Sequence, residues 1–145
     1  MPNGNLRDYY WRIVAFLAGC WEFLDARHSA FQFPSDGEVE HTGALNATIV
    51  FWNGARLYTR ASLDERAAAA IREYDYAYIY YDRRGKRIFQ YDDAPHHPGL
   101  STHPHHLHLG AKLERGPERV HPTDIPRAEF IAVVEKIIEQ IERSE

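Results

Sequence analysis

The sequence predicts an α+β domain in which an antiparallel sheet of about five strands packs against an N-terminal and a C-terminal helix. Two helix-periodic segments lie near the ends of the chain, and the segments between them alternate apolar and polar residues as half-buried strands do. The 145 residues contain no repeat and no linker, so we expect a single domain that spans residues 1–145.

The N-terminal part of the chain predicts a helix followed by a loop. Apolar residues over 6–24 recur at the spacing of a helix with a broad buried face, although the aromatic residues after Gly19 also suit a strand. Residues 33–44 mix proline, glycine and acidic residues, which indicates a loop or an edge hairpin.

A β-hairpin comes next. Residues 46–52 and 55–62 are rich in β-branched and aromatic side chains, and they flank the pair Asn53-Gly54. Asparagine and glycine tolerate the positive φ of a tight hairpin turn, so this pair is a strong local signal for the turn.

The following segment predicts a short helix and then a second hairpin. Alanines and charged residues over 62–74 favour a helix, and Ser62 and Glu65 have the spacing of a capping box. The tyrosine-rich run 74–82 and the run 87–92 then alternate as strands do and are joined by a charged turn.

One more strand and a helix complete the predicted fold. Residues 105–114 can pair as a strand beside the second hairpin. The final helix has Thr123 or Asp124 as its N-cap and Pro126 in its first turn. Its apolar stripe consists of Phe130, Val134, Ile137, Ile138 and Ile141.

Charge and cysteine content limit the classes of protein that fit. The formal net charge is 17 − 21 = −4, which does not favour indiscriminate binding of nucleic acid. The single cysteine, Cys20, excludes an internal disulfide and a cysteine-based metal site and favours a cytoplasmic protein. No signal peptide is recognisable, and no apolar run reaches the roughly 20 residues of a membrane span, so we expect no membrane partner.

The segment 91–109 concentrates the residue types that can carry chemistry. If His106 and His108 lie on a strand, period-two geometry directs both imidazoles to one face. They would then hold a metal ion or act as acid and base on a phosphate, with Asp92 or Asp93 as a further ligand or an orienting group. The histidines of this segment are His96, His97, His103, His105, His106 and His108.

These residues give two sets of functional candidates. The alternative is that the histidine-rich loop is only solvated, in which case neither set has a role. The predicted catalytic residues are Asp92, His96, His97, His105, His106 and His108. The candidate ligands of a divalent metal ion are His97, His106, His108 and Asp92.

A basic turn directly precedes the histidine segment. Its cations are Arg83, Arg84, Lys86 and Arg87, and the strand before it contributes Tyr76, Tyr78, Tyr80 and Tyr81. Cations that meet phosphates and tyrosines that stack on bases are typical of a nucleic-acid-binding surface. A solvated turn on a strand of half-buried tyrosines is the simpler interpretation.

The run QYDDAPHHPGLSTHPHHLHLG at residues 90–110 resembles the TumE family, the toxins of bacterial and archaeal toxin–antitoxin loci. Members of that family carry a pattern similar to R-Y-D-N-A-P-H-H and, after a short spacer, F-P-H-H-K-H. Residues 90–97 correspond to the first half and residues 103–108 to the second. The order of a hairpin, a tyrosine-rich strand and a closing helix is similar as well.

The resemblance implies a toxin that is held inactive by an antitoxin encoded beside it. A nuclease acting on RNA is the activity expected by analogy. Gln90, Asp93 and Leu107 stand where the family pattern has Arg, Asn and Lys, so two cations near the histidines are missing.

Two other interpretations stay open. The chain can be a non-catalytic module whose histidine-rich loop binds a metal or a partner protein, in keeping with the acidic net charge. It can also be an inactive relative that forms a homodimer or sequesters a partner.

Overall fold

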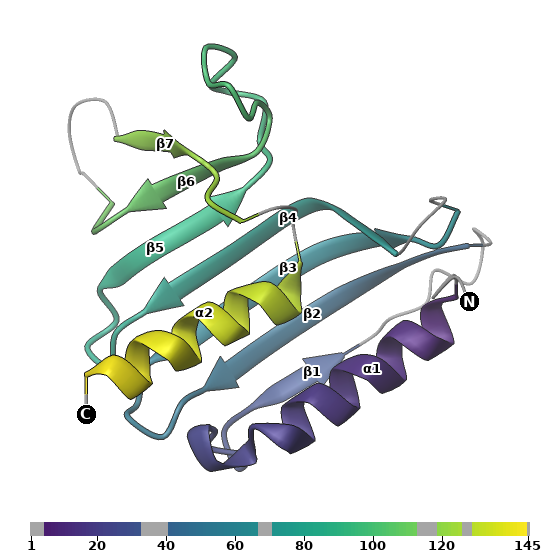
Figure 1. Cartoon of the computed structure of the whole chain (residues 1–145), viewed down its shortest axis with the longest axis vertical. Coiled ribbons are helices and arrows are strands. Elements are labelled where there is room, and N and C mark those ends of the chain that lie inside the picture. Colours follow the sequence, from purple (N-terminus) through teal and green to yellow (C-terminus); the bar gives the residue numbers. More distant parts are fainter. Residues whose placement is uncertain (1–4, 33–40, 67–70, 113–118, 126–128, 145) are drawn as a thin grey trace.

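The computed structural model describes residues 5–32, 41–66, 71–112, 119–125 and 129–144 and contains one antiparallel sheet of seven strands and two long helices (Figure 1). The strands lie in the sheet in the order of the chain, from β1 to β7. The predicted α+β class is confirmed, but the sheet has seven strands rather than about five.

The bounds of the elements are as follows. In chain order they are α1 (Leu6–Gly19), the 3-10 helix η1 (Trp21–Phe23), β1 (Ala30–Gln32), β2 (Thr42–Val50), β3 (Arg56–Asp64), β4 (Arg72–Tyr81), β5 (Arg87–Asp92), β6 (His106–Leu109), β7 (Val120–Pro122) and α2 (Phe130–Arg143). None of the helices that the structure describes is long and apolar enough to cross a membrane.

Both α1 and α2 cover the same face of the sheet (Figure 1). The buried stripe of α2 consists of Phe130, Val133, Val134, Ile137 and Ile141, while Ile138 is only partly buried. It packs in one core with Tyr9 and Ile13 of α1 and with the apolar residues of the strands. Burial of such side chains, at about 1.5–3 kcal/mol each, holds the helices on the sheet.

The pairing register divides the strand residues between two faces. Leu57, Tyr80 and Phe89 are cross-strand neighbours and lie buried beneath the helices. The alternate positions, which include Arg60 and Asp92, point to the face that α1 and α2 leave uncovered. We call this second surface the open face.

The predicted short helix over residues 62–74 is wrong at both ends, because its first residues belong to β3 and its last three to β4. Ser62 lies inside β3 and pairs with Ala44 of β2, because burying Leu63 in the core outweighs local helix propensity. Glu65 does not cap this segment either, since its carboxylate accepts the Leu6 N–H at 2.9 Å. Residues 67–70 lie outside the described residues.

Two short strands were not predicted. The edge strands β1 and β7 have three residues each, too few to show a period. The strand expected over 105–114 ends at Leu109, where Gly110 adopts a φ of +80°. Most of the expected loop over 33–44 lies outside the described residues, and its last three residues belong to β2.

The ends of both helices also differ from the prediction. After Gly19 the chain forms the 3-10 turn η1, so the first helix stops earlier than expected. Glu129, not Thr123 or Asp124, stands at the N-cap of α2. Asp124 instead accepts a hydrogen bond from the Tyr91 hydroxyl. Pro126 lies outside the described residues.

Candidate functional site on the open face

Strands β5 and β6 bring Asp92, His106 and His108 together on the open face. Asp92 of β5 is the register partner of His106 of β6. The neighbouring pair, Tyr91 and Leu107, has the opposite orientation and points into the core. The Nε2 atoms of His106 and His108 are 3.1 Å apart, and the Asp92 carboxylate lies 2.7 Å from the first and 3.2 Å from the second. Both imidazoles therefore lie on one face, as the His-x-His spacing predicted.

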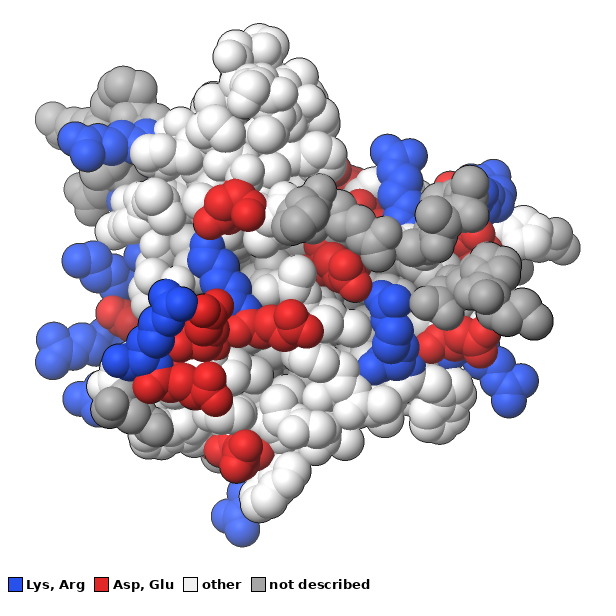
Figure 2. All heavy atoms as spheres, in the orientation of Figure 1, with Lys and Arg blue, Asp and Glu red and all other residues white. Residues whose placement is uncertain are grey.

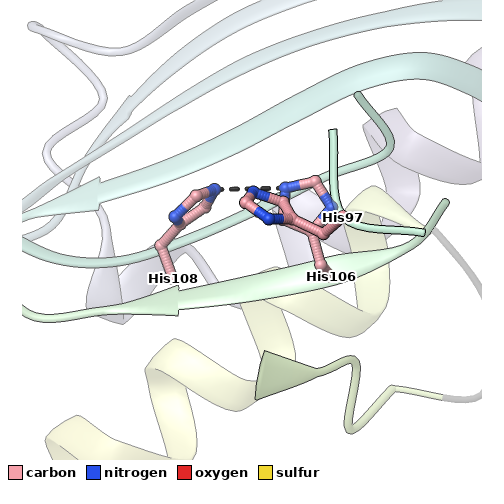
Figure 3. A group of neighbouring side chains, drawn as sticks. All are labelled: His97, His106 and His108. Atoms are coloured by element: carbon pink, nitrogen blue, oxygen red, sulfur yellow. Dashed lines mark hydrogen bonds between the residues drawn. The ribbon is translucent and has the colours of Figure 1, made fainter. Parts of the chain in front are cut away.

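His97 joins this group from the loop that follows β5. Figure 3 shows its ring directed toward those of His106 and His108. The centroid of the His97 ring lies 4.9 Å from that of His106 and 6.1 Å from that of His108. One ligand nitrogen from each of the three histidines lies within 4.8 Å of the other two. His106 and His108 are buried, whereas His97 is half-buried. We call Asp92, His97, His106 and His108 the histidine cluster.

Hydrogen bonding assigns one proton in the cluster. Nδ1 of His106 lies 2.8 Å from the carbonyl oxygen of Pro104, which can only accept, so this nitrogen carries a hydrogen. In a neutral ring the Nε2 lone pair then faces the Asp92 carboxylate at 2.7 Å. Two acceptors at this distance repel each other unless a proton or a metal ion lies between them. The contact is therefore satisfied either by a second proton on His106, which makes an ion pair with Asp92, or by a metal ion.

The surroundings keep Asp92 charged. Burial acts to raise the pKa of this carboxyl, but hydrogen bonds from His108, the Ala94 N–H and Gln90 outweigh burial and hold the pKa below its usual value. Desolvation and the neighbouring imidazoles lower the pKa of His97, so its neutral form is favoured. An anionic carboxylate and neutral imidazoles are the forms that ligate metals.

A relay of side chains along β5 positions Asp92, and the sequence analysis missed it. Arg87 donates through Nη1 to Oε1 of Gln90 at 3.2 Å, and Nε2 of Gln90 donates to the Asp92 carboxylate at 2.8 Å. Arg87 also donates to the Gly110 carbonyl at 2.9 Å and is buried, so its predicted role in binding nucleic acid gives way to this one. The spacing of two between Gln90 and Asp92 on a strand was the available signal.

The other predicted residues around the loop lie outside the cluster. His96 is exposed and lines, together with the cluster, a hollow in the open face. His105 turns away and makes a 2.8 Å hydrogen bond with the Tyr76 hydroxyl. Asp93 accepts the N–H groups of Asp75 and Tyr76 and so holds a β-bulge in β4.

The absence of a lysine at position 107 does not affect the cluster. Leu107 is 4% exposed and points into the core beneath the helices, away from the open face. The family pattern has a cation at positions 90 and 107. Of these two positions, only that of Gln90 lies on the same face as the histidines.

The basic turn is separate from the cluster in space. Arg83, Arg84 and Lys86 are exposed and precede the first residue of β5, whereas Asp92 is its last residue. Five steps of about 3.4 Å separate these ends by about 17 Å. Proximity in sequence therefore does not become contact between the two.

A hollow of about 330 Å³ gives access to the cluster. The histidine cluster and Gln90 line one side of it, and Arg60, Asp75 and Ala77 line the other. The hollow lies on the open face, so a ligand can reach the cluster without displacing either helix.

Comparison with known families identifies the relationship that the histidine motif indicated. A family model described as Toxin TumE matches residues 24–144. The chain belongs to the TumE family. The match contains every residue of the histidine cluster, while α1 precedes it. No curated protein and no solved structure matches the chain.

Membership of the TumE family confirms the predicted resemblance. It makes the chain a toxin by family, and it implies an antitoxin as its partner. The chemistry of the toxin has to be argued from the cluster itself.

Proposed function

We propose that this TumE-family toxin cleaves RNA and that the histidine cluster is its reaction centre. The observation that supports this most is the convergence of three imidazoles and one carboxylate at the floor of an accessible hollow. Such a ligand set suits zinc and the divalent ions of the first transition row. A bound ion would polarise the scissile phosphate and lower the pKa of a bound water.

The chain's own residues would hold and orient this centre. The Pro104 carbonyl fixes the His106 tautomer so that Nε2 faces inward. Gln90 and Arg87 fix the rotamer of Asp92. His97 is half-buried, lines the hollow and can ligate the ion or transfer a proton.

The proposal is tested with protein purified without a nickel column. We expect stoichiometric divalent metal and cleavage of a labelled single-stranded RNA by the wild type, and loss of both in His106→Ala/His108→Ala. His121→Ala is the matched control, because His121 is exposed on β7 outside the cluster. Circular dichroism checks that each variant is folded. Full cleavage by the folded double variant would contradict the proposal.

A growth assay links the chemistry to toxicity. Induced expression of the wild type should arrest growth and degrade cellular RNA, whereas His106→Ala/His108→Ala should do neither. Cleavage that persists in chelator with a metal-free protein would assign the histidines to acid–base catalysis without a metal.

One observation favours a second function, a metal-binding module that does not cleave. Asp75, Asp92 and Asp93 all line the hollow, and carboxylates attract cations but repel the phosphates of a substrate. Stoichiometric metal with intact RNA after growth arrest would support this function over cleavage.

A further inference from the structure

The open face continues beyond the histidine cluster as a track of three hollows. Arg60 and Ala77 line both the hollow at the cluster and a second one of about 490 Å³. Tyr58 joins the second hollow to a third, of about 560 Å³, which Arg56 and Arg84 line at the basic turn. The cluster and the basic turn are thus the two ends of one continuous surface.

The track carries positive charge that the fold does not use. Among the described residues, no carboxylate lies within salt-bridge distance of Arg56, Arg60, Arg83 or Arg84. Arg56 and Arg60 are exposed on alternate positions of β3, about 13 Å apart on the same face. This spacing offers two contacts to an anionic chain that lies along the strand.

Part of the acidic surplus lies on the other face of the molecule. Figure 2 views the helix-covered face and shows acidic side chains gathered over α2. Glu135, Glu139 and Glu142 of α2 are exposed there. On the track, aspartates line the two ends, Asp75, Asp92 and Asp93 at the cluster and Asp82 at the basic turn. Of the residues that the structure describes, those that line the middle hollow include Arg60 and no carboxylate.

An aromatic side chain lies midway between the two arginines of β3. Tyr58 is 41% exposed, although large aromatic side chains are usually buried. Tyr81 contacts it with ring centroids 5.6 Å apart and planes at 80°, so Tyr81 can cover at most one of the two faces of the Tyr58 ring. A cation, an exposed aromatic ring and a second cation in line are the elements of a single-strand binding surface.

We infer that a single-stranded nucleic acid binds along this track, with a base stacked on Tyr58 and phosphates on Arg60 and Arg56. The inference rests on the proposed function, because the strand would deliver its scissile phosphate to the histidine cluster. A duplex fits poorly, since the stacking face of Tyr58 needs an unstacked base. The arginines also offset the repulsion of phosphates by the aspartates at the cluster end.

Binding is measured separately from cleavage. We use His106→Ala/His108→Ala as the background, which keeps Tyr58, Arg56 and Arg60 and is expected to stop cleavage, and follow a short fluorescent single-stranded RNA by anisotropy. Adding Tyr58→Ala should weaken binding roughly tenfold, and Tyr58→Phe should restore it. Adding Arg60→Ala should lower the slope of log K against log salt by about 0.7. Arg7→Ala, an exposed arginine on α1, is the matched control and should change neither value.

The outcomes separate the inference from the proposed function. Single-stranded DNA should bind with the same dependence on Tyr58, because neither stacking nor charge reads the 2′-hydroxyl. Equal affinity for a duplex, or affinity that is unchanged by both Tyr58→Ala and Arg60→Ala, would overturn the track. Cleavage by wild type in the same samples would still leave the histidine cluster as the reaction centre. Binding along the track by a wild type that never cleaves would retain the track and reject the nuclease.

Discussion

Two buried carboxylates lie on opposite faces of the same sheet, and their surroundings differ. Glu73, under the helices, accepts hydrogen bonds from the hydroxyls of Tyr9 at 2.5 Å and Tyr78 at 2.6 Å and from the Phe130 N–H at 3.0 Å. Asp92, on the open face, has imidazoles as its main partners and a hollow in front of it. Both side chains are nearly inaccessible to solvent.

The difference separates a structural carboxylate from a functional one. The donors to Glu73 come from α1, β4 and α2, so this group ties both helices to the sheet. Burial raises its pKa to about 7, although the hydroxyl and N–H donors oppose the shift. The pKa of Asp92 is lowered, and its imidazole neighbours leave a place for a cation. The partners of Glu73 are hydroxyls and a backbone N–H that can only tether it, whereas Asp92 faces imidazoles that can ligate an ion.

The largest expected effect is on stability, from alanine at the two positions. Glu73→Ala strands two hydroxyls and one N–H in the core, at about 1–3 kcal/mol each, so we expect a loss of about 4 kcal/mol in the free energy of unfolding. Asp92→Ala should lose only about 1 kcal/mol, because the histidines can turn to water in the hollow. Urea titration of both variants measures the difference.

Metal content should respond in the opposite order. Asp92→Ala should lose the bound ion and RNA cleavage, whereas any folded Glu73 variant should keep both. Equal losses of stability at the two positions would contradict the distinction between tether and site.

A second prediction concerns pH and Glu73. The folded pKa of about 7 exceeds the unfolded value of about 4.5, so the native state binds more protons between these values. The contribution of Glu73 to the free energy of unfolding is therefore complete below pH 4.5 and is lost as the pH rises through 7. The loss should reach about 3 kcal/mol, since each unit is worth 1.36 kcal/mol.

The groups that face Glu73 have to be compared in the same experiment. They are Tyr9 and Tyr78, Glu129, whose charge raises the pKa, and Arg12, which pairs with Glu129 at 3.0 Å. Glu73→Gln keeps these groups and does not titrate, so the wild type minus variant difference isolates Glu73. A difference that stays flat from pH 4.5 to 7.5 would show that Glu73 remains ionised in the fold.

Local signals explain most of what the sequence predicted. The Asn53-Gly54 hairpin forms with Gly54 at a φ of +84°, and the apolar stripe of α2 is buried as its period required. The His-x-His spacing placed His106 and His108 correctly because strand geometry alone decides it.

The remaining features depend on contacts that are distant in sequence. Glu73 gave no signal, since its partners Tyr9 and Phe130 are 64 and 57 residues away. The sequence analysis named His97 and not His96 as a candidate ligand, but it kept His96 and His105 among the catalytic candidates, because only the path of the loop shows which histidines converge. The short helix failed for the same reason, as pairing with β2 overrode local propensity.

A third prediction sharpens the description of the site by removing a residue behind the ligands. Gln90→Ala deletes the donor that holds Asp92 and should weaken zinc affinity about tenfold, the range typical of such supporting groups. Competition with a chromophoric chelator measures the affinity, and Gln140→Ala on the exposed side of α2 is the control. Unchanged affinity would show that the histidines orient Asp92 without the relay.

The smallest expected effect concerns Asp93, the neighbour of Asp92. Asp93→Asn introduces the residue of the family pattern, and its carbonyl oxygen can keep the bond to the Tyr76 N–H while the bond to the Asp75 N–H weakens. We expect a loss of about 1 kcal/mol in unfolding free energy, with metal content and cleavage unchanged, because the Asp93 carboxylate lines the hollow but is held by the backbone of the bulge. Asp92→Asn is the matched control and should change metal content with little change in stability. Loss of metal in Asp93→Asn would show that the bulge of β4 positions the cluster and that the two adjacent aspartates act together.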